Sequence, residues 1–484
     1  MSETAQTQVA HRHWILIAAM MAMFMAAIEV TIVATAMPTI IAELGGFSQF
    51  GWVFSIYLLT QAVSVPIYGR LADLWGRKRV FFFGTSLFLV GSVLCGFSTN
   101  MGWLILFRAL QGLGAGAIMP LTATIIADVY APKERAGIQG WLSSVWGVSA
   151  IVGPLTGAWI VQHFNWALIF WVNVPIGIIS MLMLARWFPE PDRQQKHKLN
   201  LAGSGWLMLT VTALLTALLQ AEMLGYWVLA LIAVAIMAGY ALVRHEKRSG
   251  EPLFPLALWR SRTIVAGNAG NLIIGAAMMG ISAFLPGWIQ GVNGGTPLQA
   301  GSALAMMSIG WPLASTLSGK LMLRTSYRFT AQLGSLLLIL GTAMLLTLHS
   351  DSSVMHAGLS AFVIGTGMGM TSTTFLIAVQ NSAEYSIRGI CTASIMFSRM
   401  LGSALGTAVM GAVLNYNLTL RLPEFHDPVQ QIISPSQREA LPQASLQHII
   451  EQTASSLHWV FAVSVVIALG SMLVARAIPA GRPE

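Results

Sequence analysis

Residues 14–37, WILIAAMMAMFMAAIEVTIVATAM, form a continuous apolar run with a single ionisable residue, Glu29. A helix rises ~1.5 Å per residue, so a run of this length crosses a hydrocarbon core of ~30 Å. Glu29 is therefore expected inside the membrane, where a charged side chain costs about 2.5–3.5 kcal/mol on insertion scales. Because such residues usually face a protein-lined cavity, this segment predicts a membrane protein with a functional site within the bilayer.

The composition of the whole chain supports a membrane protein. Of the 484 residues, 55% are hydrophobic and only 9% are charged, which excludes a soluble globular protein. Apolar runs long enough to cross a bilayer predict fourteen transmembrane helices. They lie at 14–37, 50–68, 80–97, 102–127, 137–161, 167–188, 199–219, 225–243, 264–289, 298–317, 329–348, 354–378, 390–414 and 457–475.

The basic residues predict the orientation of the chain. Counted over alternate connections, 22 of the 26 Lys and Arg residues fall on one side, which the positive-inside rule makes the cytoplasmic side. An even number of spans places both termini on that side. Arg108 and Arg399 fall within predicted spans, and Arg421 and Arg438 fall in the connection 417–456, which is expected to be an external loop.

The predicted spans group as six, two and six. We expect an N-terminal six-helix bundle at 1–198, two additional transmembrane helices with a cytoplasmic linker at 199–261, and a C-terminal six-helix bundle at 262–484. Two six-helix halves suggest an internally repeated transporter whose substrate site lies between the halves, near the middle of the bilayer.

The loop GRLADLWGRKR, which begins at Gly69, carries the most specific pattern in the chain. Its glycines, Gly69 and Gly76, allow a tight turn, and Asp73 can cap the N-terminus of a neighbouring helix. Arg77 and Arg79 can bridge to that carboxylate and to lipid phosphates. The pattern resembles the signature loop G-x-L-a-D-r-x-G-r-k of the major facilitator superfamily, which implies a cytoplasmic gate loop.

A second pattern, RALQGLGAG from Arg108, resembles the family motif R-x-x-q-G-x-g. Counted along the predicted helices, Glu29 lies ~22 Å from the cytoplasmic start of its span and Arg108 ~9 Å from the external start of its own. The two side chains therefore reach similar depth, and the resemblance implies that they line the same half of a cavity. The alternative is that Arg108 only donates hydrogen bonds to neighbouring carbonyl groups.

Two further patterns indicate an exporter. Gly147, Gly153, Pro154 and Gly157 resemble the G-x5-G-P-x-x-G motif of the family's exporters, although Ala158 replaces a final glycine. Small residues allow close helix packing, and a proline bends a helix, which suits a gating element.

The first and sixth spans resemble a particular subfamily. EVTIVA, from Glu29, resembles the first-helix signature of the fourteen-helix drug:proton antiporters, in which the acid is commonly Asp, and NVPIG, from Asn173, fits the same subfamily. The resemblance implies that Glu29 and Arg108 serve proton coupling and substrate binding.

Several polar residues have more than one expected role. Gln111, Asn268, Asn271 and Arg399 are candidates for cavity-lining or gating residues. The two asparagines could instead join helices, and Arg399 could pair with backbone. Three acids near span ends are expected to be solvated: Asp128, Glu222 and Glu384.

These patterns predict a proton-coupled antiporter, not an enzyme, that exports lipophilic, preferentially cationic, drugs or toxic compounds by alternating access. The alternatives are a major facilitator transporter of an anionic or neutral metabolite, and a membrane sensor without transport. We expect no cofactor beyond the proton, no metal and no nucleic acid. The expected partners are a small-molecule substrate and the lipid bilayer of the bacterial inner membrane. The chain is expected to act as a monomer, and the sequence leaves open whether a periplasmic adaptor takes part.

Overall fold

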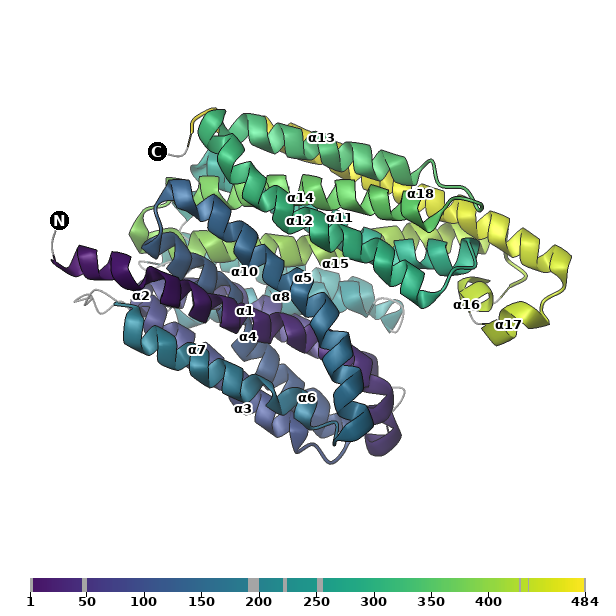
Figure 1. Ribbon diagram of the computed structural model, residues 1–484, viewed down its shortest axis with the longest axis horizontal. Helices are drawn as coiled ribbons and strands as arrows, with labels where there is room; N and C mark the ends of the chain where they lie inside the picture. The colour runs from purple at the N-terminus through teal and green to yellow at the C-terminus, as the bar shows by residue number, and fades with distance from the viewer. Residues whose placement is uncertain are drawn as a thin grey trace. The chain divides into compact units, whose positions relative to one another are not determined.

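The computed structural model describes residues 3–45, 50–189, 200–220, 224–249, 256–425, 428–433 and 435–482. Over these ranges the chain forms helices and no strand (Figure 1). Contacts divide it into two compact units, which we describe separately. Unit 1 comprises Met1–Arg135, Val145–Val265 and Val379–Phe397, and unit 2 comprises Ala136–Ser144, Ala266–Ala378 and Ser398–Glu484.

The helices follow the predicted order. The first part of the chain contains α1 (Glu3–Leu44), α2 (Phe50–Trp75), α3 (Arg77–Gly96), α4 (Met101–Val129), α5 (Pro132–His163), α6 (Leu168–Trp171), α7 (Asn173–Trp187), α8 (Leu201–Leu219) and α10 (Trp227–Arg248). The remainder contains η2 (Leu256–Arg260), α11 (Arg262–Gly287), the π-helix η3 (Trp288–Val292), α12 (Pro297–Arg324), α13 (Tyr327–Leu345), α14 (Val354–Ser382), η4 (Tyr385–Ile387), α15 (Arg388–Arg421), α16 (Pro428–Ile433), α17 (Pro435–Ala440) and α18 (Gln443–Ala475).

Each of the fourteen predicted segments coincides with helix in the described residues. Within the described part of the chain, twelve helices are long and apolar enough to cross a membrane, and these twelve include neither α8 nor α12. The apolar part of α8, Ala202–Leu218, is shorter than the rest. The protein is therefore an all-helical membrane protein with about twelve candidate spans, and the fourteen-span count stays a prediction.

The connection predicted at 417–456 is shorter than expected. The sequence suggested a loop at 417–456, but α15 continues to Arg421 and α18 already begins at Gln443, with α16 and α17 between them. Pro442 lies directly before the first residue of α18. Residues 443–456 contain no proline or glycine, so no helix-breaking residue interrupts α18 over this stretch. The prolines and polar residues had suggested irregular structure where a polar helix forms.

Glycines of α4 allow unit 1 to pack tightly. A Cβ added to Gly114 would lie 2.2 Å from the backbone nitrogen of Phe88 on α3. On the other side of α4, a Cβ added to Gly112 would lie 2.5 Å from the carbonyl oxygen of Tyr57 on α2. The glycine pattern that follows Arg108 therefore lets two helix backbones approach α4, as small residues do in membrane helices.

Helix α1 packs against α5 and α7 in the same unit. Ser180 of α7 donates a hydrogen bond to the carbonyl oxygen of Ala18 at 2.7 Å, and Thr31 donates to that of Ser149 on α5 at 3.1 Å. A Cβ added to Gly153 would lie 2.0 Å from the Thr31 hydroxyl. The exporter-like glycine pattern of α5 thus lies against α1, close in sequence to Glu29.

Unit 2 packs by the same means. The helices α13 and α18 lie side by side (Figure 1), joined by the buried hydroxyls of Ser335 and Ser471 at 2.8 Å. A Cβ added to Gly365 on α14 would lie 2.2 Å from the carbonyl oxygen of Met307 on α12. A Cβ added to Gly369 would lie 2.3 Å from that of Trp311. Small residues again determine which helices can touch.

Enlarging Gly114 should separate α3 from α4. Gly114→Ala places a methyl group against backbone atoms, which cannot move without shifting a helix, so we expect a loss of about 1–3 kcal/mol in stability. The matched control is Gly205→Ala in α8, where an added Cβ meets nothing within 4 Å, and no loss is expected there. Thermal unfolding of the purified protein in detergent measures both, and equal midpoints for the two variants would contradict this packing.

Candidate functional site

Glu29 and Arg108 form an ion pair in the interior of unit 1. The Arg108 Nη1 atom donates to Glu29 Oε1 at 2.5 Å, and the two side chains are 1% and 0% exposed. The similar depth expected from helix rise is therefore confirmed by direct contact. Glu29 comes from the middle of α1, and Arg108 from the second turn of α4.

Neighbouring side chains satisfy most of the remaining groups of this pair. Arg108 also donates to Gln111 Oε1 at 2.7 Å and, through Nε, to the carbonyl oxygen of Val53 at 3.2 Å. Gln111 in turn donates to the Ser92 hydroxyl on α3 at 2.7 Å. Arg108 therefore does donate to a backbone carbonyl group, as the alternative expected, but it does so in addition to forming the ion pair with Glu29.

Asn173 holds the other carboxylate oxygen. Its Nδ2 atom donates to Glu29 Oε2, while its Oδ1 atom is buried and meets no hydrogen-bond partner among the described residues. Asn173 is placed by a helix break: Pro175 has no N–H to donate to the carbonyl group of Trp171, and α7 begins at Asn173. The sequence predicted this segment as one continuous helix, 167–188, and did not identify Asn173 as a partner of Glu29.

An aromatic ring covers the guanidinium group. The Arg108 Cζ atom lies 4.1 Å from the centroid of the Tyr57 ring, a cation–π geometry. The buried network of Glu29, Arg108, Gln111, Asn173, Ser92 and Tyr57 therefore joins five helices of unit 1. A buried ion pair is tolerable only with such additional hydrogen bonds, because desolvation of both ions is costly.

A second network forms where α2 meets α3. The predicted loop from Gly69 to Arg79 is helical there except at Gly76, because α2 continues to Trp75 and α3 begins at Arg77. Asp73 accepts hydrogen bonds from the backbone N–H groups of Gly389 and Ile390, at 2.9 and 2.8 Å, at the start of α15. The expected cap of a helix N-terminus is therefore present, and the partner helix belongs to the segment 379–397 of unit 1. Gly69 allows this approach, since a Cβ there would lie 2.3 Å from the Ala393 methyl group.

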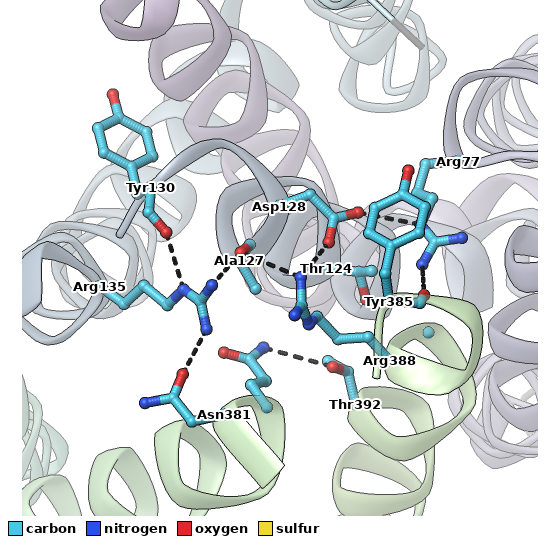
Figure 2. Close-up of polar contacts among 12 residues, drawn as sticks. Arg77, Thr124, Ala127, Asp128, Tyr130, Arg135, Asn381, Tyr385, Arg388 and Thr392 are labelled. Atoms are coloured by element: carbon cyan, nitrogen blue, oxygen red, sulfur yellow. Dashed lines mark hydrogen bonds and ion pairs between the residues drawn. The ribbon is translucent and has the colours of Figure 1, made fainter. Parts of the chain in front are cut away.

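Arg77 links Asp73 to a further acid, Asp128. Arg77 Nη2 lies 3.0 Å from Asp73 Oδ1, and Arg77 Nε lies 3.0 Å from Asp128 Oδ2. Figure 2 shows Arg77 and Arg388 converging on Asp128, with Arg388 Nη1 at 2.6 Å. Gly76 adopts a φ of 101°, which only glycine takes readily, and so turns the chain between Asp73 and Arg77.

Asp128 corrects a sequence expectation. It was expected to be solvated, but its side chain is only 6% exposed and bridges two arginines. Its partners lie 51 and 260 positions away along the chain, so no local pattern indicated them. Glu384 is exposed, as expected, and Glu222 lies outside the described residues.

Arg135 provides another contact to the segment 379–397. It donates to Asn381 Oδ1 at 2.5 Å and to the backbone carbonyl groups of Tyr130 and Ala127 (Figure 2). Arg77 also donates to the carbonyl oxygen of Tyr385 at 2.7 Å and lies over its ring. We call these contacts of Asp73, Arg77, Asp128, Arg135 and Arg388 the loop network.

The other sequence candidates belong to neither network. Arg79 is exposed at the start of α3. Asn268 and Asn271 lie on α11 in unit 2 and join helices, because they accept hydrogen bonds from Ser398 at 2.8 Å and from Ser372 at 3.4 Å. Arg399 lies on α15 in unit 2, and its side chain makes no hydrogen bond or ion pair with the described residues, so the expected alternative of pairing with backbone is not observed.

Comparisons with known proteins agree on one family. The profile of the Major Facilitator Superfamily matches residues 19–407. The chain is 32% identical to the multidrug transporter protein MdtP of Bacillus subtilis (strain 168), over 93% of this chain and 90% of that protein. It is 30% identical to multidrug resistance protein 3 of the same organism, over 96% of this chain and 94% of that protein.

A solved structure supports the fold alone. The proton:xylose symporter XylE, bound to 6-bromo-6-deoxy-D-glucose, superimposes with a TM-score of 0.64 and 14% sequence identity, covering 98% of both chains.

Neutralising Asp128 should loosen the loop network. In Asp128→Asn, Arg77 and Arg388 lose their shared counter-charge, and breaking buried pairs is strongly destabilising. Cys391 is buried one residue after Ile390 and reports on opening. With Cys95 replaced by Ala, we expect a membrane-permeant maleimide to label Cys391 about tenfold faster or more. Glu384→Gln, an exposed neighbour, is the matched control, and identical labelling rates would refute a closing role for Asp128.

Proposed function

Since the chain belongs to the major facilitator superfamily, we propose that it is a proton-coupled antiporter that exports lipophilic, preferentially cationic, compounds by alternating access. The observation that carries this proposal is the ion pair of Glu29 with Arg108, fully buried in a membrane-spanning bundle. Ionisable residues at such depth mark ion or substrate pathways.

The relatives support multidrug export. Two bacterial proteins that match nearly the whole chain are named as a multidrug transporter and a multidrug resistance protein. The family and these relatives are transporters and not enzymes. The exporter-like glycines of α5 lie against α1. Gly153 approaches Thr31, which follows Glu29 by two residues, so a movement of α5 would be felt next to Glu29.

The pair suggests how a proton could drive transport. While both carboxylate oxygens of Glu29 are held by Arg108 and Asn173, no cation can reach them. A proton on Glu29 would remove its charge and release Arg108. Once that proton leaves, a lipophilic cation in the place of Arg108 would be the counter-charge of the ionised carboxylate. Because proton and substrate compete for one carboxylate, each displaces the other, which is the requirement for antiport.

The loop network fits one of the two states that alternating access needs. It fastens the segment 379–397 to the gate loop, and Asp73, Arg77 and Asp128 are each largely buried there. We take this as the state in which the cytoplasmic side is closed. Opening requires these contacts to break, so their strength sets the population of the other state.

The proposal includes a topology. We propose fourteen spans, with both termini in the cytoplasm of a bacterial cell, the plasma membrane as the location and a monomer as the working unit. The basic residues of alternate connections support the orientation. The pairing of α8 with α10 supports two additional helices that cross together, with Asn200 bound to Glu246 and His245 at their shared end.

Sided labelling tests this topology. Tyr226 lies at the turn between α8 and α10 and is 93% exposed, and Lys247 lies at the opposite end of α10. In a protein without its native cysteines, we expect an impermeant maleimide to label Tyr226→Cys in intact cells, and Lys247→Cys only after permeabilisation. Protection of both positions, or labelling of both, would show that α8 and α10 do not cross the membrane.

Glu29→Gln tests the coupling. The measurement is uptake of a fluorescent lipophilic cation into proteoliposomes under an imposed pH gradient. We expect the variant to bind and exchange the dye but to lose gradient-driven transport by at least about tenfold. The matched control is Glu43→Gln, an exposed acid on the same helix that accepts a hydrogen bond from Trp166 at 2.7 Å. If Glu29→Gln still responds to the gradient, Glu29 is not the coupling acid.

A further inference from the structure

Arg399 is a cation to which no described residue supplies a counter-charge, in a helix that is a candidate membrane span. It lies 11 residues, or ~16 Å, along α15 from the start at Arg388. Its side chain is partly exposed, and no described residue forms a hydrogen bond, an ion pair or a ring contact with it. Such an arginine needs water or an anion at its guanidinium group.

Three arginines of the two networks each pair with a carboxylate, whereas Arg135 donates to backbone carbonyl groups and to Asn381. Arg77 pairs with Asp73 and Asp128, Arg108 pairs with Glu29, and Arg388 pairs with Asp128. Each of these carboxylates lies within 3.0 Å of its arginine. Arg399 has the same side chain as these arginines, but no carboxylate of the described residues lies beside it.

The acids of unit 2 do not supply the missing charge. Its described acids, Asp351, Glu424, Glu439 and Glu451, are all exposed. Glu451 precedes Gln452, whose side chain accepts from Arg421 at the far end of α15, 22 residues or ~33 Å from Arg399.

The neighbours of Arg399 hold its backbone firmly but are uncharged. A Cβ added to Gly275 on α11 would lie 2.0 Å from the Arg399 carbonyl oxygen, so the two helices touch at this level. Ser398 donates to Asn268 at 2.8 Å, and Ser403 donates to the Arg399 carbonyl oxygen at 3.0 Å. Both hydroxyl groups therefore donate their hydrogen bonds elsewhere. The backbone of Arg399 is held by close packing, and no described acid lies beside its guanidinium group.

We infer that Arg399 binds the carboxylate group of amphiphilic organic substrates, so that the transporter accepts carboxylate-bearing compounds as well as simple lipophilic cations. The planar guanidinium fork matches a carboxylate with two parallel hydrogen bonds, and a membrane interior strengthens them. This inference rests on the proposed transport function, because the carboxylate belongs to the transported compound.

A matched pair of dyes tests the inference. Rhodamine 110 carries a free carboxylate, and rhodamine 123 is its methyl ester with the same ring system. Equilibrium binding of both dyes to the purified protein in neutral phosphatidylcholine, at neutral pH, requires no transport. We expect Arg399→Gln to weaken binding of the carboxylate dye about tenfold to hundredfold and to leave binding of the ester within about twofold.

Two further variants sharpen the result. Arg399→Lys keeps the charge but loses the fork, so its affinity for the carboxylate dye should lie between those of the wild type and Arg399→Gln. Arg421→Gln removes the same charge from the exposed end of the same helix and should bind both dyes as the wild type does. Retained binding of the ester shows that each variant is folded.

Several outcomes would overturn the inference. Equal weakening of both dyes in Arg399→Gln would assign the residue a structural role, and no change for either dye would leave it solvated by water. A wild type that binds only the ester would exclude a carboxylate site without any variant. If added phosphatidylglycerol or chloride raises the thermal stability of the wild type but not of Arg399→Gln, while both bind the two dyes alike, the anion is a lipid headgroup or an inorganic ion.

The two proposals can fail separately. Proton-coupled export fails if the wild type does not move the ester dye in response to a pH gradient. Carboxylate recognition fails in the binding measurement, whatever the transport result.

Discussion

The cost of placing charge in a medium of low dielectric constant constrains this structure more than any other interaction. A buried ion is acceptable only when an opposite charge and several hydrogen bonds surround it. Glu29 and Arg108 meet that requirement through Asn173, Gln111 and the Tyr57 ring. Their contacts determine how α1, α2, α4 and α7 must be aligned, so the same interaction that makes a site also fixes the register of unit 1.

Close packing is the condition that lets these charges meet. The glycines of α4 bring α2 and α3 within backbone contact, and those of α5 bring it against Thr31 on α1. In a membrane, where no hydrophobic effect drives one helix against another, small residues allow the van der Waals contact that holds helices together. The glycine patterns are thus both the family signature and the physical reason that the side chains of the buried network are within hydrogen-bonding distance.

Sequence reasoning succeeded where a one-dimensional rule applies. Helix rise is additive, so the equal depth of Glu29 and Arg108 followed from counting residues. Asp73 was expected to cap a neighbouring helix because a carboxylate accepts hydrogen bonds from the free N–H groups of a helix N-terminus. Asn173 and Asp128 were missed as partners because the register between α1 and α7, and the contacts of α4 with the segment 379–397, depend on packing between distant segments. The helical extension to Gln443 was missed because polar composition does not distinguish an exposed helix from a loop.

Helix α15 is continuous from Arg388 to Arg421, so the N-terminus that Asp73 caps and the proposed site at Arg399 belong to the same helix. Its first turn is held by the Asp73 carboxylate, and Arg399 projects three turns later. If the helix has two positions, binding at Arg399 and capping by Asp73 are thermodynamically linked. A ligand that binds Arg399 more tightly in one position shifts the equilibrium between capped and uncapped helix by the ratio of its two affinities. Substrate chemistry sensed deep in the bilayer would in this way be registered at the loop.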